Sequence, residues 1–203
     1  MQVRKDTLIR KKEIVTAVRK LIVKYGSEKV TMKKIGQEIN VSDAAIYRHF
    51  NSKKEILSLV IDDIQETLIG DIEKIYTGKL GSLETLANIM MEHISAIEQR
   101  KGVSFQVIAE IISYGDEDLN KRMYDVINNY IAHVKGILSE GVGNGVINSD
   151  INLDSTAKLF FGMTQGLVNL WALSQYKFNL EKEYKLLWDV FLKTIAKPEN
   201  SGG

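Results

Sequence analysis

The sequence predicts an all-α fold, and three observations support this prediction. The 203-residue chain contains a single proline, Pro198, close to its end. Strand-like alternation of apolar and polar residues is nearly absent, and apolar residues instead recur at three- and four-residue steps. Hydrophobic residues make up 44% of the chain and charged residues 26%, which are ordinary values for a folded globular protein. We therefore expect helices packed around one sizeable core or two smaller ones.

The first two helices are bounded by recognisable start and stop signals. The first is expected at about 6–25, where apolar residues form one stripe and Gly26 follows as a stop signal. Thr31 is expected to cap a short second helix that turns two isoleucines inward. A turn at Asn40 comes next, because asparagine tolerates a left-handed backbone better than most residues.

The remaining helices follow the same logic. Ser42 is expected to cap a third helix that Phe50 closes, and Ser52 with Glu55 has the pattern of a capping box that opens a fourth. The fourth helix runs towards residue 76. Further helices are expected at about 82–100, 103–114, 117–141, 154–176 and 180–196.

Charge is distributed unevenly along the chain, although its formal sum is only +1. Residues 1–56 carry 14 Lys and Arg against 6 Asp and Glu, which gives +8, and the rest carry 13 against 20, which gives −7. This asymmetry indicates that the N-terminal part meets a polyanion. The alternative is that these lysines merely solvate a helix surface.

Two short helices joined by a tight turn, the second capped by Ser42, are typical of a helix-turn-helix. Ile46 and Phe50 are expected to point inward, so that Arg48 lies on the opposite face of the third helix. That face is predicted to enter the major groove of DNA. There the Arg48 guanidinium can reach the O6 and N7 atoms of guanine.

Other residues around this face suit the same partner. Alanines let the helix approach base edges closely, Ser42 can donate to a base or a phosphate, and residues at the margins can contact the DNA backbone. Lys53, at the start of the fourth helix, is a candidate phosphate anchor. The predicted DNA-binding residues are Thr31, Ser42, Ala44, Ala45, Tyr47, Arg48, His49 and Lys53.

The run from Ile14 to Leu57 carries a wider pattern, made of Ala17, Gly26, Thr31, Ile35, Val41, Ser42, Ile46, Tyr47, Phe50, Ser52, Lys53 and Glu55. With this spacing it resembles the DNA-binding domain of the tetracycline-repressor family. The departures, at Ile22, Ile39, Asn40 and Asn51, remove no DNA-facing group. The resemblance implies an all-α homodimer with an N-terminal three-helix DNA-binding unit. It also implies a C-terminal domain that binds a small molecule and dimerises through its last two helices, and repression that the ligand relieves.

The expected organisation has three parts. Residues 1–55 form a helix-turn-helix DNA-binding domain, residues 56–197 form a ligand-binding and dimerisation domain, and residues 198–203 form a disordered tail. The expected partners are a palindromic double-stranded DNA operator, a second copy of the chain and a small-molecule inducer. No cofactor, metal ion or membrane is expected.

The middle helices offer apolar and soft side chains with few charges, which suits a mainly apolar ligand held by a few polar groups. The alternative is that these side chains simply fill a helical core. The predicted ligand-binding residues are Leu86, Met90, His93, Phe105, Gln106, Met123, Asn128, Phe160 and Met163.

The last two helices carry a dimerisation signal. Lys158 is the single charge between Asp154 and Lys177, and apolar residues cover more than one face of that helix. Such a helix is buried on both sides, either against its own domain and a partner or wholly within a monomer. The predicted interface residues are Met163, Leu170, Leu187 and Phe191.

Composition and motifs disfavour several other functions. The chain has no cysteine, and its basic N-terminal segment lacks the apolar core of a signal peptide, so a cytoplasmic location is expected. The uncharged stretch 159–176 carries polar residues that favour burial in protein over a membrane. The glycines of GVGNGV at 141–146 fit a helix end better than a dinucleotide loop. Two alternatives to an inducible repressor are a constitutive DNA-binding protein and, less favoured, an all-α enzyme.

Overall fold

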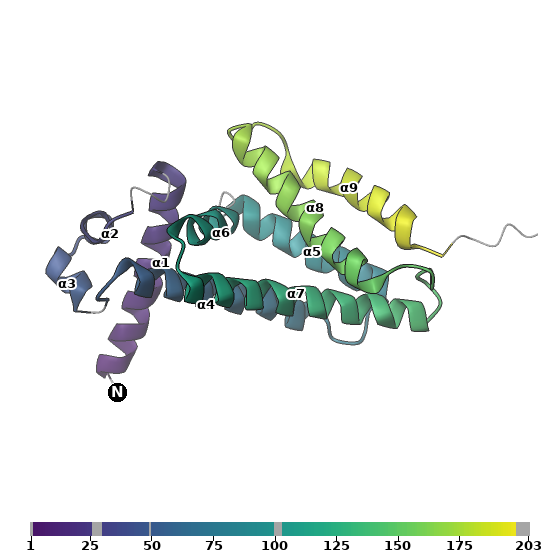
Figure 1. Cartoon of the computed structure of the whole chain (residues 1–203), viewed down its shortest axis with the longest axis horizontal. Helices are drawn as coiled ribbons and strands as arrows, with labels where there is room; N and C mark the ends of the chain where they lie inside the picture. Colours follow the sequence, from purple (N-terminus) through teal and green to yellow (C-terminus); the bar gives the residue numbers. More distant parts are fainter. Residues whose placement is uncertain (1, 26–29, 49, 100–102, 198–203) are drawn as a thin grey trace, which may run out of the picture. The chain divides into compact units, whose positions relative to one another are not determined.

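The computed structural model describes the backbone of residues 2–25, 30–48, 50–99 and 103–197, and within these ranges every regular element is an α-helix (Figure 1). This confirms the predicted fold class. The helices are α1 (Gln2–Tyr25), α2 (Met32–Glu38), α3 (Asp43–Tyr47), α4 (Lys53–Ile75), α5 (Ser82–Gln99), α6 (Val103–Tyr114), α7 (Glu117–Gly143), α8 (Leu153–Leu173) and α9 (Leu180–Ile195). The tail expected at 198–203 lies outside the described residues.

The chain packs into two compact units that do not follow one another in sequence. Unit 1 combines residues 1–67 with 100–126, and unit 2 combines residues 68–99 with 127–203. The long helices α4 and α7 each contribute to both units. Packing therefore groups α6 and the start of α7 with the N-terminal helices, whereas chain order alone separates them.

Unit 1 is built around the inward faces of α1, α2, α3 and the first half of α4. Helix α1 packs against both α2 and α6, and α2 packs against α3. Ile14, Val18, Ile35, Ile46 and Phe50 are buried in its core, as the apolar periodicity predicts. The second-helix residue Ile39, predicted to face inward, is only half-buried at the helix end.

The ends of the α3 and α4 helices differ in detail from the sequence prediction. Helix α3 ends at Tyr47, three residues before Phe50, although the Phe50 N–H still donates to the Ile46 carbonyl at 3.0 Å. At the start of α4 the Ser52 hydroxyl accepts from the Glu55 N–H, as a capping box requires. The Glu55 carboxylate, however, accepts from the N–H of Asn51 at 2.9 Å rather than from that of Ser52. This contact lowers the pKa of Glu55.

Unit 2 contains α5, α8 and α9 together with the second halves of α4 and α7. Helix α9 packs against both α5 and α8, and Figure 1 shows α8 and α9 lying side by side. The loop after α7 is tied to the end of α9 by an isolated antiparallel bridge between Ile147 and Ala196. No described helix is long and apolar enough to cross a membrane.

The GVGNGV segment forms the end of α7 and the turn that follows it. Helix α7 ends at Gly143, and Gly145 has a φ of +71°. Gly141 lies in the last turn of α7, and a Cβ placed there would approach Ile147 Cδ1 to 2.5 Å. A dinucleotide loop is thus not needed to account for these glycines.

We expect Gly141→Ala to lower the free energy of unfolding by about 1 kcal/mol, because the added methyl overpacks a filled site whose neighbour is the flexible end of Ile147. Urea denaturation of the two proteins measures this difference. Gly143→Ala is the matched control, since a Cβ at that position would meet nothing within 4 Å apart from the adjacent backbone of its own helix. Equal destabilisation by the two substitutions would contradict the close contact.

Candidate DNA-binding interface and ligand-binding core

The helix-turn-helix of unit 1 is held by the capping residues that the sequence predicts. The Thr31 hydroxyl accepts from the Lys34 N–H at 3.3 Å, and the Ser42 hydroxyl accepts from the Ala45 N–H at 3.2 Å. Asn40 adopts a left-handed φ of +56° in the turn between α2 and α3. These contacts fix the direction in which α3 leaves the turn.

The surface of α3 divides as the sequence predicts. Ile46 is fully buried, whereas Ala44, Tyr47 and Arg48 are exposed and Ala45 is half-exposed. Arg48 follows the last helical residue, and its N–H still donates to the carbonyl of Ala44 at 3.2 Å. Exposed small residues beside an exposed guanidinium suit an approach to base edges. His49, the remaining predicted residue of this helix, lies outside the described residues.

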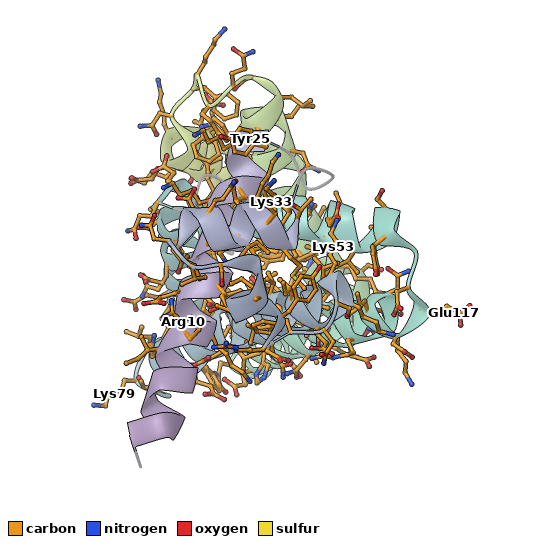
Figure 2. The ribbon with its side chains drawn as sticks, turned by 90° about the vertical axis from the view of Figure 1, so that its left-hand side faces the viewer. Arg10, Tyr25, Lys33, Lys53, Lys79 and Glu117 are labelled. Atoms are coloured by element: carbon orange, nitrogen blue, oxygen red, sulfur yellow. The ribbon has the colours of Figure 1, made fainter. Side chains whose placement is uncertain are left out.

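The first turn of α2 adds cations that the sequence prediction missed. Lys33 is exposed there, two residues after the Thr31 cap, and Figure 2 labels its side chain. The Lys34 ammonium lies 4.8 Å from the ring centroid of Tyr25, so a cation–π contact holds it against α1. The first helix of a helix-turn-helix crosses the DNA backbone, which makes Lys33 a candidate phosphate contact.

Lys53, predicted as a phosphate anchor, is already engaged inside unit 1. Its ammonium lies 2.5 Å from the carboxylate of Glu110 on α6, and 5.8 Å from the ring centroid of Tyr114. Glu110 is the single charged residue of α6 and is only 5% exposed. A lone carboxylate in an apolar helix requires a partner, and this is the signal in the sequence that identifies Glu110 as structurally important.

Lys54 is tied to the start of α7 in a similar way. Its ammonium lies 2.8 Å from carboxylate oxygens of both Asp116 and Asp118. These contacts raise the pKa of Lys54, and the Lys54 ammonium lowers the pKa of Asp116. Farther along, Arg122 of α7 pairs with Asp62 of α4. Ion pairs thus connect the N-terminal half of α4 to the segment 110–122.

The predicted ligand-binding residues fall into both units. Leu86, Met90, His93 and Phe160 are buried in unit 2, and Asn128 and Met163 are half-buried there. Met123 is buried in unit 1. The side chains of Phe105 and Gln106 lie outside the described residues.

A buried polar cluster accompanies the apolar core of unit 2. The Tyr130 hydroxyl lies 3.2 Å from Nδ1 of His93, and the Thr164 hydroxyl lies 3.1 Å from the sulfur of Met90. The Tyr184 hydroxyl is buried near Thr164, without a well-formed hydrogen bond among the described residues. Burial raises the pKa of both tyrosines. Sequence reasoning did not propose Thr164 or Tyr184 of this cluster as ligand-binding residues.

Burial lowers the pKa of His93 to about 4, despite weaker opposing effects from Asp71 and the Leu68 carbonyl. The unfolded chain, with an ordinary histidine pKa near 6.5, then binds more protons than the native state between these values. We expect stability to fall as the pH drops from about 6.5 to 4, by at most about 1.4 kcal/mol per pH unit from this group. Urea denaturation at several pH values measures the slope. His93→Gln, which cannot take up the proton, should flatten it, and an unchanged slope would contradict the assignment.

Helices α8 and α9 bury one side and expose another. The buried side of α8 consists of Ala157, Phe160, Thr164, Leu167, Val168 and Trp171. Leu170 and Leu173 are 60% and 82% exposed, and Leu159 is exposed on the same helix. On α9 the exposed apolar residues are Leu186 and Val190.

Of the two interface residues predicted on α9, Phe191 lies in the core of its own chain. Phe191 is only 2% exposed, with its ring centroid 5.6 Å from that of Phe160 and 5.7 Å from that of Trp188. Phe191 therefore belongs to the core of its own chain, whereas the neighbouring Val190, turned by roughly 100° around the helix, is exposed. Leu187 is half-buried, as is Met163 on α8.

An exposed, basic helix-turn-helix attached to a helical unit with an apolar core defines a class of protein, namely a DNA-binding regulator with a sensing domain. Within the described residues no group of three or more His, Asp or Glu side chains is placed to hold a metal ion.

Family models agree with this class over most of the chain. Residues 14–60 match the model for "Bacterial regulatory proteins, tetR family", and residues 54–194 match that for "YsiA-like protein, C-terminal region". The chain belongs to the tetracycline-repressor family of transcriptional regulators, and its relatives are regulators rather than enzymes. The resemblance seen in the sequence is confirmed.

Individual relatives are distant but cover nearly the whole chain. A fatty acid metabolism regulator protein of Bacillus subtilis is 23% identical over 83% of this chain and 86% of its own. The nucleoid occlusion factor SlmA of Vibrio vulnificus is 23% identical over 88% of this chain and 92% of its own. The solved structure of the regulator FadR from Bacillus subtilis in complex with stearoyl-CoA is similar in fold, with a TM-score of 0.78 and 22% identity over 90% of this chain and 98% of that one.

Proposed function

We propose that the chain is a homodimeric repressor that leaves a palindromic operator when a ligand with a long apolar part binds unit 2. The observation that carries this proposal is the pairing of an exposed recognition surface on α3 with a buried, mostly apolar core that holds one polar cluster. Each part of the proposal has its own support.

The DNA-binding part uses the exposed face of α3 for sequence and the neighbouring cations for the backbone. Arg48, Ala44 and Ala45 are the proposed base-contacting residues, and Thr31, Ser42, Tyr47 and Lys33 are the proposed backbone contacts. This surface lies within residues 1–55, which we propose as the DNA-binding segment. A two-fold dimer presents the surface twice, which is why we propose a palindromic operator.

The dimer part uses the exposed apolar face of α8 and α9. Leu159, Met163, Gly166, Leu170 and Leu173 recur at alternating four- and three-residue steps, which places them along one side of α8. A Cβ at Gly166 would meet nothing within 4 Å apart from the adjacent backbone of its own helix, so the backbone there is open to close approach. Leu186 and Val190 extend the apolar face onto α9. Apolar residues exposed in this number on adjacent helices are typical of a protein–protein interface.

The ligand part rests on the chemistry of the unit 2 core. Leu86, Met90 and Phe160 supply an apolar surface, and soft methionine side chains adapt to flexible chains. Tyr130, Thr164 and Tyr184 supply hydroxyl groups that can orient a polar end. A relative that binds stearoyl-CoA supports a fatty acyl compound as the first candidate.

The test measures binding and release separately. Stearoyl-CoA and coenzyme A, each at the same concentration, are added to the protein while its melting temperature is recorded. Operator fragments selected from random DNA are then titrated in the presence of each compound. We expect stearoyl-CoA to raise the melting temperature and to release DNA, and coenzyme A to do neither. Equal stabilisation by coenzyme A would contradict an apolar pocket, and stabilisation without release would contradict the coupling.

A further inference from the structure

We propose that Glu110 withholds Lys53 from DNA, so that helix α6 limits the phosphate contacts that the helix-turn-helix can make. This inference rests on the proposed DNA-binding surface, because Lys53 begins α4 directly after the turn that follows α3. It assigns to Glu110 a positioning role that acts through Lys53 and does not require Glu110 to touch DNA.

The geometry shows the Lys53 ammonium turned towards α6. Two α6 groups contact it, the Glu110 carboxylate at 2.5 Å and the Tyr114 ring at 5.8 Å. The Lys53 side chain nevertheless remains 31% exposed, so solvent reaches part of it. Glu110 itself is buried, and both residues border an apolar cavity that Val18, Ile22, Ile35 and Ile56 also line.

Whether Lys53 stays with Glu110 or contacts DNA depends on the strength of the buried ion pair relative to that of one phosphate contact. Removing one member of a buried ion pair leaves an uncompensated charge in an apolar setting, which disfavours the separated state by roughly 100-fold or more. A single phosphate contact changes DNA affinity by a smaller factor, on the order of tenfold or less at moderate salt. Lys53 therefore stays with Glu110 in the arrangement that the structure shows, and a change in the position of α6 would release it.

Glu110→Gln tests the inference, because the amide keeps the size of the side chain and removes its charge. Binding to a 30-base-pair duplex of random sequence is measured by fluorescence anisotropy between about 50 and 200 mM NaCl. We expect affinity at the lowest salt to rise about three- to tenfold, and the slope of log K against log[salt] to steepen by about one unit per protomer. Circular dichroism melting confirms that the variant is folded.

Three further variants separate the proposed cause from others. Glu117→Gln removes the same charge from an exposed residue that extends away from the ribbon in Figure 2, and it should leave the slope unchanged. Glu110→Gln combined with Lys53→Ala should lose the whole gain. Glu110→Asp keeps the charge but shortens the side chain by one methylene, so it should give a smaller gain of the same sign and serves if Glu110→Gln does not fold.

Two results would overturn the inference. One is a gain that survives in the Glu110→Gln, Lys53→Ala double variant, and the other is an equal steepening of the slope in Glu117→Gln. Failure of the proposed DNA-binding function gives a different result, since the unmodified protein would then show no salt-dependent binding to the duplex.

Discussion

Leu170→Glu is expected to convert the proposed dimer into monomers. Leu170 is 60% exposed in the single chain, so the substitution leaves the core of unit 2 intact. In the dimer, however, it would bury a carboxylate without a partner, and burying an unpaired charge costs several kcal/mol at least. Sedimentation velocity at micromolar concentration measures the change. Operator affinity should fall steeply at the same time, because a monomer contacts only one half-site.

A matched substitution distinguishes loss of the interface from a general effect of added charge. Ile112 of α6 is 67% exposed and lies on neither α8 nor α9, so Ile112→Glu adds the same group outside the proposed interface. It should leave the sedimentation coefficient unchanged. If Leu170→Glu and a second variant, Val190→Glu, both remain dimers, the two chains must associate through another surface.

The exposed side of the last helices shows what sequence periodicity can and cannot predict. The pattern on α8 separates two apolar faces correctly, and burial places Ala157, Phe160, Leu167 and Trp171 on the inner one. On α9 the same reasoning assigned Phe191 to the partner, although its ring packs among those of Phe160 and Trp188. Periodicity identifies faces of a helix, but only packing shows which of them its own chain already covers.

Local signals near the helix ends are more reliable because their causes are local. Thr31 and Ser42 cap their helices as expected, since a cap needs only a side-chain oxygen and an N–H three residues ahead. Local sequence patterns also predicted that Lys53 contacts DNA. They could not predict its ion pair with Glu110, because 57 residues separate the two in the chain. Long-range ion pairs leave no regular spacing in a sequence.

The division of the chain into two packing units could not be predicted from local sequence patterns either. The sequence suggests a boundary near residue 55, where the short helices end and a long one begins. That boundary stays a prediction. Packing adds that residues 100–126 group with the N-terminal helices, through the contact of α1 with α6 and the ion pairs that link α4 to residues 116 and 122. A helix that is continuous in sequence can belong to two packing units at once, and no composition change marks the point where it passes between them.

Arg48→Ala is expected to weaken operator binding by about 1–3 kcal/mol at each half-site, or roughly 2–6 kcal/mol for a dimer on a palindrome. Arg48 is exposed at the end of α3, so its loss should leave folding unaffected. The preferred sequence should also change, because an arginine that reads guanine is the reason that one base pair is specified. Selection from a random DNA library, run in parallel with the unmodified protein, measures both affinity and preference.

Lys33→Ala provides the matched comparison, because it removes one exposed positive charge from α2 in the same unit. A phosphate contact carries no sequence information, so this variant should bind all sequences more weakly by a similar factor and lower the salt slope by about one unit per protomer. Comparing the two substitutions therefore distinguishes a base contact, which specifies the sequence, from a phosphate contact, which does not. If Arg48→Ala kept the preferred sequence and behaved as Lys33→Ala does, the guanidinium would contact the DNA backbone, and the base-reading surface would have to be sought among Ser42, Ala44 and Ala45.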